Sequence, residues 1–122
     1  MVEITKEDVL KIHKLIVEAS GEKVDVRDMR LLESSIASTY QTFGGQDLYD
    51  SIEKKAAHMC YSIIENHPFV DGYKRVGIMM LLVMLKAYGV KKEFTDGELI
   101  ELGYEIAKGN LVRDIILEKI VK

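Results

Sequence analysis

The amino-acid sequence predicts an all-α fold, a compact helical bundle that forms one domain over residues 1–122. Two segments begin with a threonine that an acidic residue follows three positions later, a pattern typical of helix N-termini. The run 76–85 is apolar apart from Gly77, and a helix that is apolar on all sides is normally buried. Strand signals are thin, because only 90–94 could be extended and that segment is short and charged. We therefore expect helices packed around one central, buried helix.

The N-terminal half is expected to hold two helices and a loop. Thr5 and Asp8 match a capping box, so the first helix is expected to begin at Thr5 and to end at Gly21. A second helix is expected from about residue 28 to about residue 39, where leucine and isoleucine recur at helical spacing. The segment 41–47 contains paired glycines and is expected to be a loop.

The C-terminal half is expected to hold four more helices. One covers residues 51–65 and ends before Pro68, because the residue before a proline is disfavoured in the helical conformation. The apolar helix follows at 74–88. Another begins at Thr95, the second capping box, and the last spans 111–121.

Composition excludes several classes of function. The net charge of −3 gives no support to general nucleic-acid binding. The apolar run is shorter than the roughly 20 residues that a membrane-spanning helix needs. The N-terminus lacks the pattern of a signal peptide, and a single cysteine excludes an intramolecular disulfide. We expect a cytoplasmic protein that binds neither nucleic acid nor membranes.

The densest group of reactive residues is the run from His67 to Arg75, which directly precedes the apolar helix. Free backbone N–H groups and the helix dipole make a helix N-terminus a site for anions. Lys74 and Arg75 make phosphate the expected anion, and Gly72 allows the backbone to approach it. Asp71 suits Mg²⁺, which binds carboxylate and phosphate oxygens. With His67 as a general base, these residues indicate a phosphoryl or nucleotidyl transferase.

This run resembles the signature of the Fic/Doc (death-on-curing) family, His-x-Phe-x-Asp/Glu-Gly-Asn-Gly/Lys-Arg. Six positions match the signature: His67, Phe69, Asp71, Gly72, Lys74 and Arg75. The sequence departs from it at Tyr73, where the family has asparagine. The similarity extends to further segments along the chain: 4–9 with His13, 27–34, 47–49, 53–57 and 107–109.

The resemblance implies a helical core with the motif loop between two central helices. It implies that His67 deprotonates the hydroxyl of a target and that Asp71 binds Mg²⁺. It also implies that ATP is bound by the remaining motif residues: Phe69, Gly72, Tyr73, Lys74 and Arg75.

Lys74 indicates the branch of the family. The adenylylating Fic branch typically has glycine here, whereas the Doc branch has lysine. The resemblance therefore implies a Doc-like toxin that transfers the γ-phosphate of ATP to a hydroxyl of a cytosolic protein, with elongation factor Tu as the family's known kind of target. It also implies a separate small antitoxin, because the sequence contains no inhibitory motif of the Ser/Thr-x-x-x-Glu-Gly/Asn type.

Two alternatives remain open. The same residues could transfer AMP instead of phosphate. Alternatively, Tyr73 could make the protein a catalytically silent binding module, since tyrosine is larger than asparagine and less tolerant of positive φ. The Tyr73 ring could point outward, its hydroxyl could replace the amide contact, or it could block the nucleotide. A nucleic-acid-binding helical domain is the least supported interpretation.

Residues outside the motif favour ordinary structural roles. We expect His13 and His58 to be structural, and Cys60 to be unreactive because no cation flanks it closely. The loop around Phe43 and Gly44 fits two interpretations equally well. It is either a plain connection or a flap that aligns the target by pairing of backbone edges.

Overall fold

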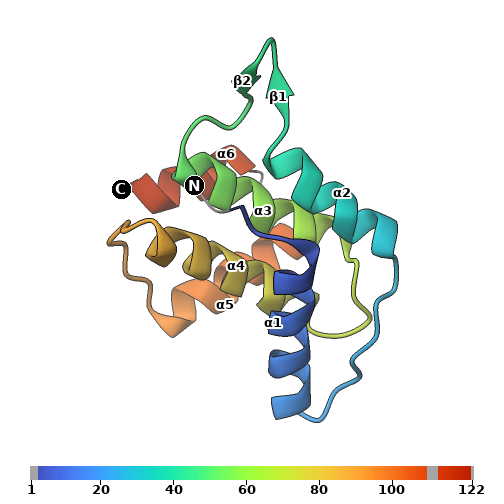
Figure 1. Cartoon of the computed structure of the whole chain (residues 1–122). Coiled ribbons are helices and arrows are strands. Elements are labelled where there is room, and N and C mark those ends of the chain that lie inside the picture. Colours follow the sequence, from blue (N-terminus) through green and yellow to red (C-terminus); the bar gives the residue numbers. More distant parts are fainter. Residues whose placement is uncertain (1–2, 110–112, 122) are drawn as a thin grey trace.

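The computed structural model describes residues 3–109 and 113–121, and within these ranges it contains six helices and one short hairpin (Figure 1). The helices are α1 (Lys6–Ala19), α2 (Met29–Thr39), α3 (Ile52–Asn66), α4 (Tyr73–Ala87), α5 (Asp96–Ala107) and α6 (Arg113–Val121). The hairpin consists of β1 (Thr42–Phe43) and β2 (Gln46–Asp47). The predicted all-α fold class is confirmed.

Both predicted capping boxes are present. The Thr5 hydroxyl accepts the Asp8 N–H at 3.2 Å, and the Asp8 carboxylate accepts the Thr5 N–H at 2.9 Å. Thr95 and Glu98 make the same pair of bonds at 3.1 and 2.9 Å. Each box satisfies backbone donors that the first turn of a helix leaves free, which explains why α1 and α5 begin where the sequence predicts.

Helices α3 and α4 lie side by side at the centre of the bundle (Figure 1). Their facing side chains supply most of the buried core: Ala56, Ala57, Met59, Cys60, Ile63, Ile64, Val76, Met80, Leu81, Met84 and Leu85. The prediction of a central apolar helix is therefore confirmed for α4, although its Met79 is 38% exposed. No helix in the described ranges is both long and apolar enough to cross a membrane.

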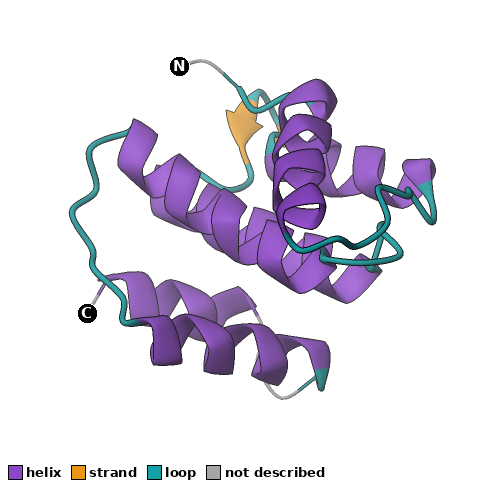
Figure 2. Ribbon diagram, turned by 90° about the horizontal axis from the view of Figure 1, so that it is seen from below, coloured by secondary structure: helices purple, strands orange, loops and turns teal. Residues whose placement is uncertain are grey.

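The other helices cover this pair on two sides. Helix α1 packs against α4, and α2 packs against α3. Helices α5 and α6 form a layer on the other side of the central pair, as Figure 2 shows from below. The loop between α3 and α4 therefore lies at one end of a pair of helices that the rest of the chain supports.

The segment 41–47, expected to be a loop, contains the β1–β2 hairpin. Thr42 pairs with Asp47 in antiparallel register, and both intervening glycines have positive φ, as a tight two-residue turn requires. The buried Lys55 ammonium donates to the Asp47 carboxylate at 3.0 Å and to the Tyr49 carbonyl, which anchors the hairpin to α3. Strands this short carry no periodicity that a sequence pattern could reveal.

The other boundaries differ little from prediction. Residues 90–94 form no strand in the part of the chain that the structure describes. The last helix was expected from residue 111. Residues 110–112 lie outside the described ranges, and α6 begins at Arg113.

His58 is structural, as expected, and ties three elements together. Its Nδ1 accepts a hydrogen bond from the Arg113 guanidinium at 3.3 Å, and its Nε2 lies 2.7 Å from the Ser38 hydroxyl. Its ring stacks on Tyr49 at 4.4 Å between centroids. Burial and the nearby Arg113 charge lower the pKa of His58 to about 4. The imidazole is therefore neutral at pH 7 and joins α6 to α2 and α3.

We predict that Gly77→Ala destabilises the protein and that Gly97→Ala does not. A Cβ atom at Gly77 would lie 2.6 Å from Ile64 Cγ1 and 3.1 Å from the Cys60 carbonyl oxygen, whereas at Gly97 the nearest atom is 4.0 Å away. Overpacking at Gly77 should lower the free energy of unfolding by about 1 to 2 kcal/mol. Removing the exposed helical glycine at 97 should raise it by about 0.5 kcal/mol. Urea unfolding measures both, and equal midpoints for Gly77→Ala and the parent would contradict this view of the α3–α4 contact.

Candidate active site

The run from His67 to Gly72 forms the loop between α3 and α4. His67 ends α3 in the left-handed conformation, with φ 50° and ψ 58°. Gly72 precedes α4, also left-handed, with φ 77°. A Cβ atom at Gly72 would lie 2.7 Å from Val17 Cγ1, so the close approach that requires glycine is, in this structure, with α1. The predicted placement of the motif at the start of the apolar helix is confirmed.

His13 and Phe69 anchor this loop to the core. The buried His13 ring stacks on Phe69, with 3.8 Å between centroids and 10° between planes. Its Nε2 lies 2.8 Å from the carbonyl oxygen of Asp71. Phe69 is 0% exposed, and its side chain anchors the loop. Its assignment to the nucleotide site stays a prediction.

His67 and Tyr73 are in direct contact. Their ring centroids are 3.8 Å apart and their planes are inclined by 37°. The His67 Nε2 atom is buried and has no hydrogen-bond partner among the described residues. Within the motif, His67 and Gly72 have left-handed backbone, whereas Tyr73 has ordinary helical backbone. The concern about positive φ at Tyr73 therefore does not arise, and its ring does not point outward.

Asp71 is half-buried and presents a single carboxylate. Its Oδ2 accepts the Lys23 N–H at 3.3 Å. In the described ranges, no three His, Cys, Asp or Glu residues cluster as metal ligands would. A magnesium ion commonly takes one or two carboxylates together with phosphate oxygens and water. Asp71 therefore fits a metal that arrives with a phosphate ligand, and not a site built from protein groups alone.

Arg75 is held by the end of α1. Its guanidinium forms an ion pair with the Glu22 carboxylate and donates to the Ser20 hydroxyl at 3.0 Å. The Ser20 hydroxyl in turn lies 2.7 Å from Glu22 Oε1. An anion at the start of α4 would compete with Glu22 for this guanidinium. No sequence pattern predicts the role of Ser20 and Glu22, because they lie more than 50 positions before Arg75 and follow no spacing rule.

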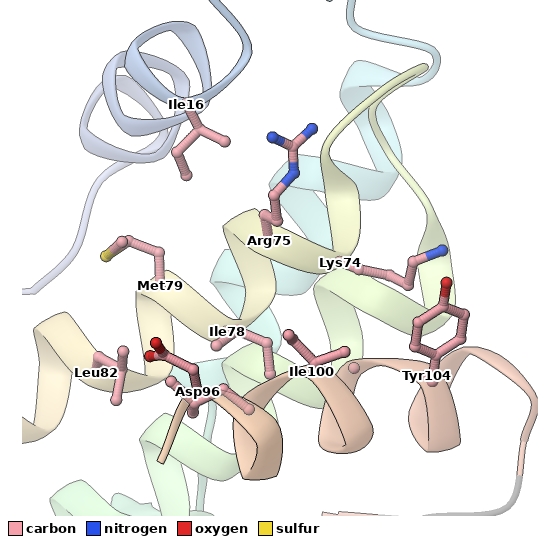
Figure 3. A pocket seen from close by; sticks show the side chains of 11 residues that line it. Ile16, Lys74, Arg75, Ile78, Met79, Leu82, Asp96, Ile100 and Tyr104 are labelled. Atoms are coloured by element: carbon pink, nitrogen blue, oxygen red, sulfur yellow. The ribbon is translucent and has the colours of Figure 1, made fainter. Parts of the chain in front are cut away.

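Lys74 points toward α5. Its ammonium lies 5.1 Å from the Tyr73 ring centroid and 5.3 Å from that of Tyr104, distances at which a cation is attracted to an aromatic face. Figure 3 shows Lys74 and Tyr104 side by side. Such partners hold the cation without neutralising its charge, so Lys74 remains able to bind an anion.

A cavity of about 480 Å³ adjoins the motif between α1, α4 and α5 (Figure 3). Its walls are mostly apolar and include Ile16, Ile78 and Met79. Lys74 and Arg75 lie at the end of the cavity next to the motif loop. The cavity therefore joins an apolar surface to the two cations of the motif.

The N-terminus of α4 lacks a side-chain cap. A side chain accepts a backbone N–H at the start of α1, α2, α3 and α5: Thr5, Asp28, Ser51 and Thr95. Gly72, which precedes α4, has no side chain and forms no such cap. Unpaired N–H groups and the helix dipole favour an anion at this end. The structure thus places His67, Asp71, Lys74 and Arg75 near a helix end that has no side-chain cap.

Comparison with known proteins gives one family and one relative. The model of the Fic/DOC family matches residues 3–85. Toxin Doc from Mycolicibacterium smegmatis is 34% identical to this chain over 88 residues. That match covers 72% of this chain and 65% of the relative, slightly less than two thirds of its length. The family match includes α3, the motif loop and α4 up to residue 85.

We predict that Glu22→Gln strengthens binding of inorganic triphosphate. The Glu22 carboxylate occupies Arg75, and a half-exposed ion pair contributes up to about 1 kcal/mol. Its loss should raise the affinity about two- to fivefold. Isothermal calorimetry at low salt measures the change. Glu18→Gln, at an exposed position on α1, removes the same charge without freeing Arg75. An equal gain in both variants would show that net charge alone is responsible.

Proposed function

Since this chain is a member of the Fic/DOC family, we propose that it is a transferase that uses Mg²⁺-bound ATP to phosphorylate a hydroxyl of a protein. One observation carries the proposal: the uncapped N-terminus of α4 is surrounded by a buried, unpartnered imidazole nitrogen, a carboxylate and two cations. These are the groups that phosphoryl transfer needs, because its catalysis rests on positioning and on stabilisation of negative charge.

His67 acts as the general base. The target hydroxyl loses its proton to His67 Nε2 while its oxygen forms a bond to the γ-phosphorus. The bond between that phosphorus and the bridging oxygen of ADP breaks, and ADP leaves with the bonding electron pair. His67 then releases the proton to solvent. The lack of a hydrogen-bond partner in the described ranges supports this role, because no competing bond must be broken before Nε2 accepts the proton. Because Nε2 is buried and the Tyr73 ring packs on the imidazole, the two rings must shift to admit the target hydroxyl.

The other motif residues bind the phosphates. Asp71 would hold Mg²⁺, which would neutralise charge on the phosphate oxygens. The N–H groups at the start of α4 would bind phosphate oxygens, and the Lys74 ammonium beside Tyr73 and Tyr104 would add a positive charge. Arg75 offers a planar pair of donors once Glu22 releases it. Gly72 has no side chain that could cap α4, so the N–H groups at the start of this helix are not occupied by a capping side chain.

Lys74 favours phosphate transfer over AMP transfer. The family resemblance associates lysine at this position with γ-phosphate transfer. Its ammonium, held between two tyrosine rings, occupies space that a glycine would leave free. Transfer of AMP stays the second candidate, with the same base and the same metal ligand.

We propose that the biological role is that of a toxin with a separate antitoxin. The match to a protein named Toxin Doc supports this role, and elongation factor Tu is the target we propose from the family resemblance. We assign the antitoxin to the cavity between α1, α4 and α5. An apolar segment there would lie against Lys74 and Arg75 and so hinder binding of phosphate.

We predict that label from γ-³²P-ATP, but not from α-³²P-ATP, appears on purified elongation factor Tu. His67→Asn should lower the transfer at least about 100-fold. Asparagine tolerates the left-handed backbone of this position but is no base, so the variant separates chemistry from folding. The parent should also slow growth when expressed, and His67→Asn should not. Transfer of the α label would establish AMP transfer instead. Absence of both labels and of toxicity would favour the silent module.

We predict that Tyr73 permits nucleotide binding. Calorimetry with Mg²⁺ and ATP should give the parent, Tyr73→Phe and Tyr73→Asn affinities within about threefold of one another, less than about 0.7 kcal/mol apart. The Phe variant is a matched control, because the Tyr73 ring contacts His67 and its hydroxyl makes no hydrogen bond in the described ranges. Binding by the Asn variant alone would show that the tyrosine blocks the site.

A further inference from the structure

His67 has a backbone conformation that needs outside support. It is the only residue other than glycine with positive φ in the described ranges. A left-handed conformation is unfavourable for a residue with a Cβ atom, and such strain persists only where the surroundings enforce it. The position after a helix is often left-handed, but it is usually occupied by glycine. Something other than local preference therefore holds His67.

Arg27 makes the contacts that can hold it. Its Nε donates to the carbonyl oxygen of His67 at 2.6 Å, and its Nη2 donates to that of Asn66 at 2.8 Å. These are carbonyls at the end of α3, which no later turn of the helix satisfies. A cation is also favoured there by the helix dipole. One planar guanidinium thus fixes two successive peptide groups, those on either side of the His67 Cα atom.

The backbone around Arg27 reinforces this contact. The N–H groups of Arg27 and Asp28 both donate to the Pro68 carbonyl, at 2.7 and 3.1 Å. Val26 forms an antiparallel bridge with Phe69. The segment before α2 therefore lies against the motif loop, and Arg27 has little freedom to move away from it. Asp28 does not compete for the guanidinium, because its carboxylate caps α2.

We propose that Arg27 is a positioning residue for His67. By holding both carbonyls it keeps His67 left-handed, and this backbone directs the imidazole onto the Tyr73 ring and toward the start of α4. The catalytic part of this inference rests on the proposed function. The positional part does not, because it concerns only the orientation of the His67 ring.

The test compares Arg27→Gln, Arg27→Lys and a control, Arg30→Gln. Arg30 lies exposed in the first turn of α2, and its side chain makes no bond within the described ranges. Thermal unfolding establishes that each variant is folded. NMR then reports the His67 ring through its proton shifts, which the Tyr73 ring perturbs, and through nuclear Overhauser contacts between the two rings. Phosphoryl transfer is measured with kcat and KM for ATP separated.

We expect Arg27→Gln to remove the His67–Tyr73 contacts and to lower kcat at least about tenfold, since small misplacements of a catalytic group are costly. The KM for ATP should stay within about twofold of the parent value. Arg27 does not contact Lys74 or Arg75, the two cations proposed to bind the phosphates. Arg27→Lys should recover part of kcat, since an ammonium lacks the planar fork that serves both carbonyls. Arg30→Gln should match the parent.

The outcomes separate the two proposals. Unchanged His67 ring signals in folded Arg27→Gln would overturn the positioning role, even if the variant is less stable. If Arg27→Gln does not fold, unchanged ring signals and kcat in Arg27→Lys would overturn it equally. A parent without any transfer activity, combined with moved ring signals in Arg27→Gln, would refute the proposed function and leave the positioning role intact.

Discussion

The close packing of α3 against α4 is the constraint on which the site depends. At Gly77 the two helices approach so closely that a single methyl group would not fit. The short loop 67–72 must then join their ends, and it does so with a left-handed residue at each end, His67 and Gly72. The left-handed backbone at His67 determines where its imidazole lies. Gly72 leaves the start of α4 without a side-chain cap. The two packed helices thus set the geometry of the loop that carries the motif.

Neighbouring elements complete the loop by contacting its backbone. His13 from α1 binds the Asp71 carbonyl, and Arg27 binds the carbonyls of Asn66 and His67. Phe69 is buried between them and the core. This arrangement holds the loop mainly through its carbonyl groups and its one aromatic anchor.

The cations of the motif have partners that an incoming phosphate can replace. Arg75 is bound to Glu22, which is itself partly exposed to solvent, and such pairs contribute little net stability. Lys74 rests against aromatic rings that leave its charge uncompensated. Tyr73, the departure from the family signature, contributes both to this support of Lys74 and to the contact with His67. Replacing the family asparagine by tyrosine thus adds an aromatic contact to the proposed base.

The sequence by itself determined the helices, because capping boxes, apolar spacing and the step before Pro68 act within a few residues. It also determined that a base, a carboxylate and two cations precede the apolar helix. Only the tertiary structure decided that Phe69 is an anchor, that 42–47 is a hairpin, and that Ser20, Glu22 and Arg27 serve the motif. The contacts of Ser20, Glu22 and Arg27 join residues 39 to 55 positions apart. No local pattern encodes such pairs, because they arise only when the packing of α1 and α2 on the central helices brings the chain segments together.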